Sequence, residues 1–331
     1  MKKIFFSLLL SLTMLTQLYS QQVIESKDYT WQKIKAQGEP QVRHENAFVE
    51  HKGKFYLLGG RGIMEVNVFD PETSEWSTKG KTPIEFNHFQ AVSYGDEIYI
   101  VCAMNGRYPV EKPIENVWTY NPEQDKWTKS HAIPKEHQRG GAGTVVYNDK
   151  FYVACGIELG HTSGTTNIFS CYDPKTGEWA PLTKAPHVRD HFAAIVHAGK
   201  LYCIGGRNSS VHRGGVKKTF FDAVCAQVDV YNFATRKWLT LVNDLPVATA
   251  AGGVAVLGEN IIYFGGEGSA AMAYNETQCL NTLTGEWTQL EKMPRGLHGS
   301  AAIVYKDAIY WAAGSYKKGG SNTGDVYRFG K

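Results

Sequence analysis

The sequence predicts an all-β fold in which six four-stranded sheets, called blades, form a closed ring, a six-bladed β-propeller. Three observations in the 331-residue chain predict it. An aromatic residue followed by two small residues, Gly-Gly in three copies, recurs six times; a tryptophan follows five of the six copies, and one more tryptophan precedes the first copy. Repeats of roughly 50 residues that contain short strands and turns are typical of propellers.

The first repeated feature is a short apolar strand that leads to two small residues. The complete copies are Phe55-Tyr56 to Gly59-Gly60, Leu201-Tyr202 to Gly205-Gly206, and Ile262-Tyr263 to Gly265-Gly266. The degenerate copies are Ile98-Tyr99 to Cys102-Ala103, Phe151-Tyr152 to Cys155-Gly156, and Ile309-Tyr310 to Ala313-Gly314. Glycine permits positive φ and close backbone approach, so we expect a tight turn at each doublet.

The second repeated feature is a tryptophan with a large apolar residue seven positions before it. The pairs are Phe69 and Trp76, Tyr120 and Trp127, Tyr172 and Trp179, Tyr231 and Trp238, and Leu280 and Trp287. The sixth copy has Val326-Tyr327 and no tryptophan after it, while Trp31 lies before the first copy. We therefore expect residues 29–34 to form the outer strand of the last blade, which closes the ring and removes exposed sheet edges.

This combination of repeated features resembles the Kelch family over residues 28–331, because the doublet, the aromatic residue and the tryptophan recur together in the same order. The resemblance implies one four-stranded blade per repeat and closure by an N-terminal strand. The expected blades are residues 43–76, 86–127, 139–179, 189–238, 250–287, and 297–327 with Trp31.

The N-terminus has the pattern of a secretory signal peptide, since Met1-Lys2-Lys3 precedes a short apolar run over residues 4–12. We expect residues 1–20 to be the signal peptide and residues 21–331 a single six-bladed Kelch propeller. The protein would then be exported to the periplasm or secreted. The run is too short to span a membrane well, and the sequence has no second long apolar stretch, so we expect no membrane span.

The net charge argues against a nucleic-acid-binding protein, and the cysteine spacing shows no metal-binding motif. Without Lys2 and Lys3, 33 basic residues face 32 acidic ones, a formal charge of +1, so the basic stripe that nucleic acid requires is absent. The six cysteines show no C-x-x-C spacing, and any disulfide pairing stays open. The sequence requires no metal and no cofactor, although clustered histidines could hold a metal.

Ionisable residues concentrate at one level of the predicted ring. Counting back thirteen residues from the tyrosine of each repeat reaches the start of the innermost strand, where polar side chains gather in four blades. Two arginines directly follow glycine doublets, and in ligand-binding Kelch proteins such positions line the central pocket. The expected catalytic residues are His88, His191 and Arg207, with Arg61 and Arg207 as carboxylate binders. The expected substrate-binding residues are Arg61, His44, Asn87, Asp190, Arg139, Arg189 and His298.

Some positions have a second interpretation or extend the site. Arg43, Arg139 and Arg189 begin inner strands, where an arginine either bridges blades or contacts substrate. The loops would add Tyr108, His161, His212, Arg213 and Tyr316 to the rim of the pocket.

A pocket rich in arginine and histidine suits a carboxylated or sulfated ligand, so the expected partner is an acidic oligosaccharide or sugar acid. The first hypothesis is a carbon–oxygen lyase that cleaves uronate saccharides by β-elimination, in which arginine neutralises the carboxylate and histidine or tyrosine takes the proton. The leaving group would be a sugar, as in a polysaccharide lyase, or water, as in a dehydratase. Resemblance to sialic acid mutarotases makes a mutarotase or epimerase the alternative, and a non-catalytic propeller that binds glycan or protein is the third reading.

Overall fold

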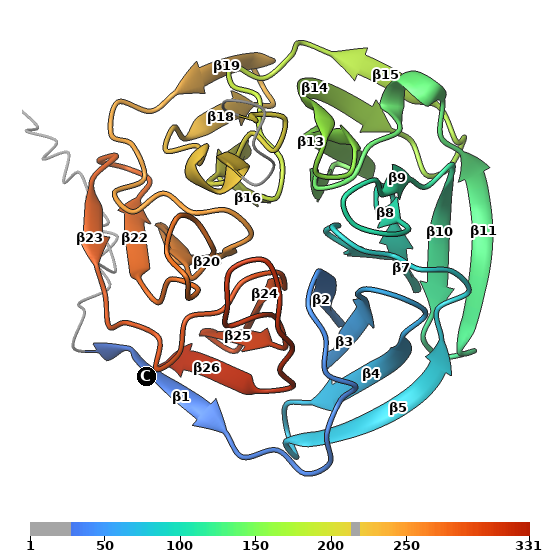
Figure 1. The fold of residues 1–331 in the computed structure, drawn as a ribbon, viewed down its shortest axis with the longest axis vertical. Helices are drawn as coiled ribbons and strands as arrows, with labels where there is room; N and C mark the ends of the chain where they lie inside the picture. The colour runs from blue at the N-terminus through green and yellow to red at the C-terminus, as the bar shows by residue number, and fades with distance from the viewer. Residues whose placement is uncertain (1–27, 213–218) are drawn as a thin grey trace, which may run out of the picture.

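The computed structural model describes residues 28–212 and 219–331, which form six four-stranded antiparallel sheets around a central axis (Figure 1). From the axis outward, the first three blades contain β2 (Asn46–His51), β3 (Lys54–Gly59), β4 (Glu65–Asp70) and β5 (Glu75–Lys81); β6 (Val92–Tyr94), β7 (Glu97–Ile100), β10 (Asn116–Asn121) and β11 (Lys126–Ala132); and β12 (Gly143–Tyr147), β13 (Lys150–Leu159), β14 (Ser163–Tyr172) and β15 (Trp179–Leu182).

The other three blades contain β16 (Ala193–His197), β17 (Lys200–Ile204), β18 (Asp229–Asn232) and β19 (Lys237–Thr240); β20 (Gly253–Leu257), β21 (Asn260–Phe264), β22 (Thr277–Asn281) and β23 (Trp287–Gln289); and β24 (Ala302–Tyr305), β25 (Ala308–Ala312), β26 (Val326–Gly330) and β1 (Thr30–Ile34). A two-stranded sheet, β8 (Met104–Asn105) with β9 (Lys112–Pro113), projects from blade two. Two 3-10 turns, η2 (Lys135–His137) and η4 (Thr219–Asp222), complete the described elements.

The predicted closure of the ring is confirmed. Strand β1 pairs antiparallel with β26, with Trp31 opposite Phe329. The indole of Trp31 is 6% exposed, its ring centroid lies 5.0 Å from that of Phe264 in blade five, and its Nε1 donates to Thr277 Oγ1 at 2.9 Å. Trp31 therefore ties the N-terminal strand to the neighbouring blade as well as to its own.

The repeated tryptophans take the expected places on the outer strands. Trp76 lies opposite Phe69 in the β4–β5 register, and their ring centroids are 5.1 Å apart. Tyr120 and Trp127 make the equivalent pair in blade two, at 4.8 Å. Aromatic rings at this separation fill the outer part of each blade, which explains the regular recurrence of the pair in the sequence.

One repeat position, which we call the ring position, joins the six blades around the axis. It is occupied by Glu45, His88, Gly141, His191, Ala251 and Gly299, all with φ between 51° and 73°. The backbone N–H of each ring residue in blades two to six donates to the carbonyl of the ring residue in the preceding blade, at 2.6 to 3.2 Å. Asn46 N–H donates to the Gly299 carbonyl at 3.2 Å and completes the circle.

In blade five the residue equivalent to Arg189 lies one position earlier than the sequence count predicts. Gly156, the second residue of the blade-three doublet, donates its backbone N–H to the carbonyl of Arg189. Gly206, the second residue of the blade-four doublet, donates to the carbonyl of Thr249. Thr249 is therefore the equivalent of Arg189, and the prediction of Ala250 was wrong. The cause is Tyr263, which lies two residues before its doublet, whereas Tyr202 lies three residues before its own.

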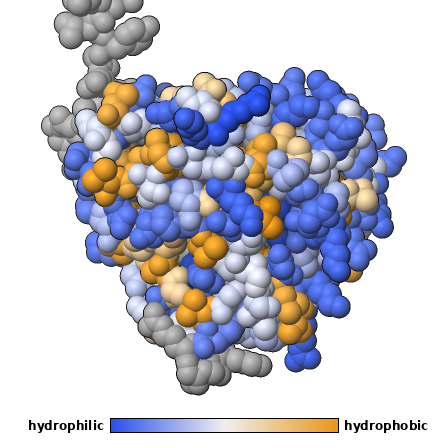
Figure 2. All heavy atoms as spheres, turned by 90° about the horizontal axis from the view of Figure 1, so that it is seen from above, coloured by the Kyte–Doolittle hydropathy of each residue, from blue (hydrophilic) through white to orange (hydrophobic). Residues whose placement is uncertain are grey.

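Two further predictions concern targeting and the surface. Residues 1–20, the predicted signal peptide, lie outside the described residues. Among residues 28–212 and 219–331, no helix is long and apolar enough to cross a membrane. Seen edge-on, the molecule has hydrophobic side chains scattered in small groups among hydrophilic ones (Figure 2). This face of the molecule therefore offers no broad apolar surface.

Candidate functional site

A cavity of about 640 Å³ opens among the loops at one end of the ring. Every blade contributes to its lining, which consists of His44, Glu45 and Arg61 from blade one, Tyr108 from two, His161 from three, Arg207 and Phe221 from four, Glu267 from five, and Lys318, Gly319, Gly320, Ser321 and Asn322 from six. We call this cavity the mouth pocket. It exists only when all six blades are assembled.

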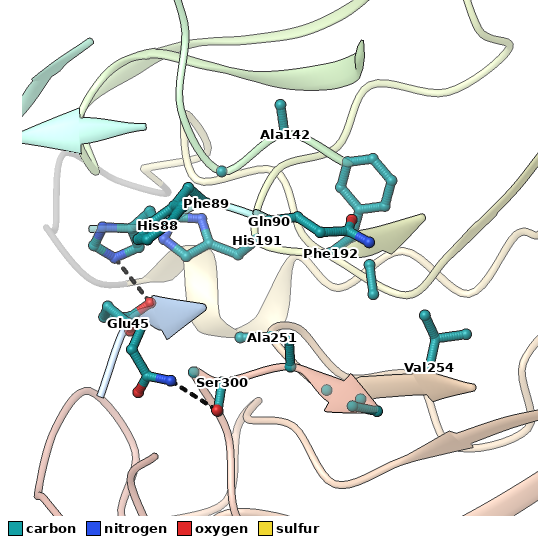
Figure 3. Close-up of a pocket in the computed structure, with 18 residues that line it drawn as sticks. Glu45, His88, Phe89, Gln90, Ala142, His191, Phe192, Ala251, Val254 and Ser300 are labelled. Atoms are coloured by element: carbon teal, nitrogen blue, oxygen red, sulfur yellow. Dashed lines mark hydrogen bonds and ion pairs between the residues drawn. The ribbon is translucent and has the colours of Figure 1, made fainter. Parts of the chain in front are cut away.

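A smaller cavity of about 70 Å³ lies along the axis beneath the mouth pocket. The ring residues and the residues that follow them line it, and Figure 3 shows Glu45, His88 and His191 close together at its wall. Glu45 lines both cavities. The ring position therefore separates the mouth pocket from the axial channel.

Three histidines meet at this boundary, and we call them the histidine cluster: His88, His161 and His191. Their ring centroids are 4.5 to 5.0 Å apart. One ring nitrogen from each lies within 4.8 Å of the other two, and the side chains are 1%, 7% and 2% exposed. Two of them occupy ring positions, whereas His161 follows β13, a ten-residue strand that extends beyond its blade. The long β13–β14 hairpin thus brings a third imidazole over the axis.

Each histidine of the cluster is held through its Nδ1 by a different partner. His191 Nδ1 pairs with the Asp190 carboxylate, His88 Nδ1 lies 2.5 Å from Asn87 Oδ1, and His161 Nδ1 lies 3.3 Å from Glu111 Oε2. Asn87 Nδ2 donates to Glu85 at 2.5 Å, so the amide presents its oxygen to His88. Since all three partners accept, each Nδ1 donates and each neutral ring keeps its lone pair on Nε2.

The Nε2 atoms of His88 and His191 differ in their neighbouring polar groups. His191 Nε2 is buried without a hydrogen-bond partner among the described residues. His88 Nε2 lies 3.2 Å from Glu45 Oε2 and 3.5 Å from Arg61 Nη2. Burial holds the pKa of His88 and His191 well below the usual value, and the neighbouring histidines and arginines lower both further. Both imidazoles are therefore neutral at pH 7.

The carboxylates around the site are buried and paired. Burial raises the pKa of Asp190, although Arg207, Ser209 and Thr165 oppose the shift. For Glu267 burial would also raise the pKa, but His298 and Arg207 lower it to about 2. Glu267 is consequently ionised throughout the physiological range.

The two expected carboxylate binders, Arg207 and Arg61, differ in the exposure of their side chains. Arg207 is 1% exposed, its Nε donates to Ser209 Oγ at 2.9 Å, its Nη1 pairs with Glu267, and Phe220 and Phe221 lie 5.0 and 5.2 Å from its guanidinium. The side chain of Arg61 is 28% exposed and donates to Glu111 at 2.8 Å. Arg61 is thus the more accessible guanidinium.

The structure distributes the predicted site residues over three places. His44, Arg61 and Arg207 line the mouth pocket, together with two predicted rim residues, Tyr108 and His161. His88 and His191 lie beneath it, where Asn87 and Asp190 hold their rings. The predicted rim residue Arg213 lies outside the described residues.

Three predicted substrate-binding residues lie away from the pocket lining. Arg139, 1% exposed, donates to the carbonyls of His137, Val153 and Cys155. Arg189, 0% exposed, donates to three carbonyls and pairs with Asp229. His298 is fully buried, and its Nε2 donates to the Lys317 carbonyl at 2.9 Å and lies 3.3 Å from Glu267. An arginine at the start of an inner strand folds back under its own doublet, so we assign Arg139 and Arg189 to the fold.

The site also contains acidic residues that were not predicted. Glu267 directly follows Gly265-Gly266, the repeat position that Arg61 and Arg207 occupy in their blades, so the sequence did contain a signal for it. Glu45 occupies the ring position of blade one. Glu111 lies in the blade-two loop between β8 and β9, which has no counterpart in the repeat.

Comparison with known proteins identifies the family. Residues 14–252 match the sequence profile of the family described as Attractin/LZTR1 beta-propeller. The chain belongs to this family of Kelch-repeat propellers. Kelch-like protein terF of Aspergillus terreus (strain NIH 2624 / FGSC A1156) is 27% identical over 330 residues, covering 94% of this chain and 69% of that protein.

Other relatives of this Kelch propeller are considerably longer. Kelch-like protein 25 of Xenopus tropicalis is 27% identical over 82% of this chain, and human Kelch-like protein 23 is 26% identical over 80%. The matches cover 44% of each of those two proteins. A solved structure, titled "Structure of YjhT", superimposes with a TM-score of 0.72 at 15% identity and covers 88% of this chain and 95% of its own, a likeness of fold.

Proposed function

We propose that this Kelch propeller is an exported carbohydrate-active enzyme that cleaves uronic-acid-containing saccharides by β-elimination in the mouth pocket. The observation that carries the proposal is the partly exposed guanidinium of Arg61 in a cavity enclosed by all six blades. A volume of about 640 Å³ is within the range of small-molecule sites.

Arg61, Arg207 and Lys318 line the mouth pocket together with the carboxylates of Glu45 and Glu267. The carboxylates of Glu45 and Glu267 are 7% and 2% exposed and face His88 and Arg207 respectively. The side chain of Arg61 is 28% exposed although its Nη1 donates to Glu111, and Lys318 is half-buried at the wall of the same cavity. A carboxylate can pair with Arg61 in the bidentate geometry that guanidinium groups favour.

Two lining residues suit the proton transfers. His44 Nδ1 lies 2.6 Å from Asn322 Oδ1, an acceptor that leaves the lone pair of the neutral ring on Nε2. Burial raises the pKa of Tyr108, so its hydroxyl keeps its proton at pH 7. His88 and His191 have side chains 1% and 2% exposed, so we assign proton transfer to His44 and Tyr108 and a supporting role to the cluster.

In the proposed reaction Arg61 neutralises the substrate carboxylate and makes the neighbouring C5 proton more acidic. His44 Nε2 accepts that proton, the C–H electron pair becomes the C4–C5 double bond, and the C4–O bond breaks. The hydroxyl of Tyr108 donates its proton to the leaving oxygen, which departs as a sugar hydroxyl or as water. Reprotonation of Tyr108 from His44 through solvent completes the cycle.

The test is ultraviolet absorbance during incubation with oligosaccharides of galacturonate, glucuronate, mannuronate and guluronate, because the new double bond is conjugated to the carboxylate. We expect absorbance to rise with one substrate, and to rise at least a hundredfold more slowly for Arg61→Gln. Arg236→Gln, an exposed arginine on an outer turn, is the matched control and should behave as wild type.

A flat trace with every substrate would exclude elimination. If NMR then showed faster anomer exchange of a sugar acid, the protein would be a mutarotase, because ring opening needs the same acid and base around the anomeric oxygen. Saturable binding without either reaction would make it a glycan-binding propeller.

A further inference from the structure

We propose that His88, His161 and His191 bind one divalent transition-metal ion, of the Zn²⁺ class, through their Nε2 atoms. The site lies between the mouth pocket and the axial channel, and its ligands come from three consecutive blades.

The first support is distance. One ring nitrogen of each histidine lies within 4.8 Å of the other two. Imidazole nitrogens bind zinc at about 2.0–2.1 Å, so two ligands of one ion lie at most about 4.2 Å apart. Small rotations of the three rings close this difference. His161 lies at the tip of the β13–β14 hairpin, whereas His88 and His191 lie at ring positions.

The second support is the set of Nδ1 partners. Asp190, Asn87 and Glu111 each accept from a different histidine and so leave each Nε2 available. Metal-binding histidines characteristically donate their other ring N–H to a carboxylate or carbonyl, which fixes the tautomer and the orientation of the ring. The same arrangement occurs here three times on three separate partners.

The third support is the surroundings of the Nε2 atoms. His191 Nε2 is buried and has no hydrogen-bond partner among the described residues. The lone pair of a neutral His88 faces the Glu45 carboxylate at 3.2 Å, and two acceptors at this distance repel each other. The guanidinium of Arg61, 3.5 Å from His88 Nε2, reduces this repulsion only weakly, because the distance is long for a hydrogen bond. A cation bound by both Nε2 atoms would use both lone pairs and attract the Glu45 carboxylate, while Arg61, itself a cation, keeps its partner Glu111.

The chemistry of the ligands selects the metal. Three neutral imidazoles suit Zn²⁺, Cu²⁺ or Ni²⁺ better than Mg²⁺ or Ca²⁺, which prefer oxygen. Three protein ligands also leave a coordination position open, as in catalytic zinc sites. Since His161 lines the mouth pocket and Arg61 lies 3.5 Å from His88 Nε2, an ion held there would be near the cavity and would help to neutralise a substrate carboxylate. This role rests on the proposed function, whereas metal binding does not.

The experiment is isothermal titration of chelator-treated protein with ZnCl₂, combined with elemental analysis and with Co²⁺ substitution. We expect one Zn²⁺ per chain and a visible Co²⁺ spectrum typical of low coordination number. His161→Gln should weaken zinc binding more than a hundredfold, and Asp190→Asn by 10- to 100-fold. His197→Gln, at the last residue of β16 and outside the histidine cluster, should bind as wild type.

Near-ultraviolet circular dichroism verifies that each variant is folded. Absence of zinc binding and of a Co²⁺ spectrum in folded wild-type protein would overturn the inference, as would equal zinc affinity for His161→Gln and His197→Gln. Zinc binding without uronate cleavage leaves the metal site standing and removes the proposed function. Full cleavage by chelator-treated protein, together with no zinc affinity, would remove the metal site and leave the proposed function standing.

Discussion

At the scale of single residues, the site depends on side chains held at an unfavourable backbone geometry. Glu45, His88 and His191 have φ of 58°, 52° and 51°, in the left-handed region that costs a residue with a Cβ about 1–2 kcal/mol. The circle of inter-blade hydrogen bonds keeps them there. Strain of this kind concentrates at functional sites. Gly141 and Gly299 occupy the same position in other blades without this cost.

Gly141→Ala tests the ring position. A Cβ on Gly141 would lie 3.2 Å from the backbone nitrogen and 3.4 Å from Nδ1 of His191, at a φ of 60°. We expect a loss of about 2 kcal/mol in the free energy of unfolding, from backbone strain and from this contact. Gly95→Ala, with φ of 61° and open space around it, should lose only about 1 kcal/mol. Urea denaturation compares the two, and equal losses would contradict the crowding at His191.

Glu267→Gln tests the buried ion pair. The variant leaves Arg207 buried without its charged partner, so we expect the free energy of unfolding to fall by about 3 kcal/mol at pH 7. The pKa of Glu267 is lowered from 4.5 to about 2, so its contribution is present above pH 4.5 and disappears as the pH falls towards 2. Urea denaturation at pH 7, 4 and 3 should show the two proteins converging, and a constant difference would contradict the assignment.

At the scale of elements, two extensions outside the repeat complete the site. The blade-two loop brings Glu111, and the β13–β14 hairpin brings His161, whose backbone N–H donates to the Pro109 carbonyl at 3.0 Å. The repeat predicted Arg61, His88 and His191 because each occupies a regular position. His161 was expected only at the rim, and Glu111 was missed, because their place in the site depends on a contact between two insertions.

Trp31→Ala tests the closing strand. Trp31 packs against Phe264 and Phe329 and donates to Thr277, so its removal should cost about 3–5 kcal/mol of unfolding free energy. Trp31→Phe keeps an aromatic ring and loses the N–H, and should cost less than half as much. Guanidinium denaturation measures both. A loss below about 1 kcal/mol for the alanine variant would show that β1 contributes little to the ring.

At the scale of the whole molecule, the fold could be predicted almost completely from the sequence, and the site only in part. Closure and blade number follow from recurrent spacing, which the structure confirms through the pairing of β1 with β26. The burial of Arg139 and Arg189 could not be deduced from their repeat position, because that position does not specify whether a side chain points to the axis or back under the doublet. Convergence of all six blades on one cavity makes ring assembly a condition for the site.

The proposed metal would make the dependence of the site on ring assembly measurable as a change in the free energy of unfolding. Ligands from blades two, three and four would add a bond between three sheets that already meet through packing, the ring of backbone hydrogen bonds and side chains such as Gln90, which bonds to Thr144 and Ala194. An ion that binds only the folded ring stabilises it by RT ln(1 + [L]/Kd), about 2.7 kcal/mol at a free concentration of 100 Kd. We expect Zn²⁺ at that concentration to raise the unfolding free energy of wild-type protein and of His197→Gln by this amount, and that of His161→Gln by less than about 0.4 kcal/mol. Urea denaturation with and without zinc measures the effect. An equal rise in all three proteins would show that zinc acts elsewhere on the molecule, because His161 is the only one of the two substituted histidines that belongs to the cluster.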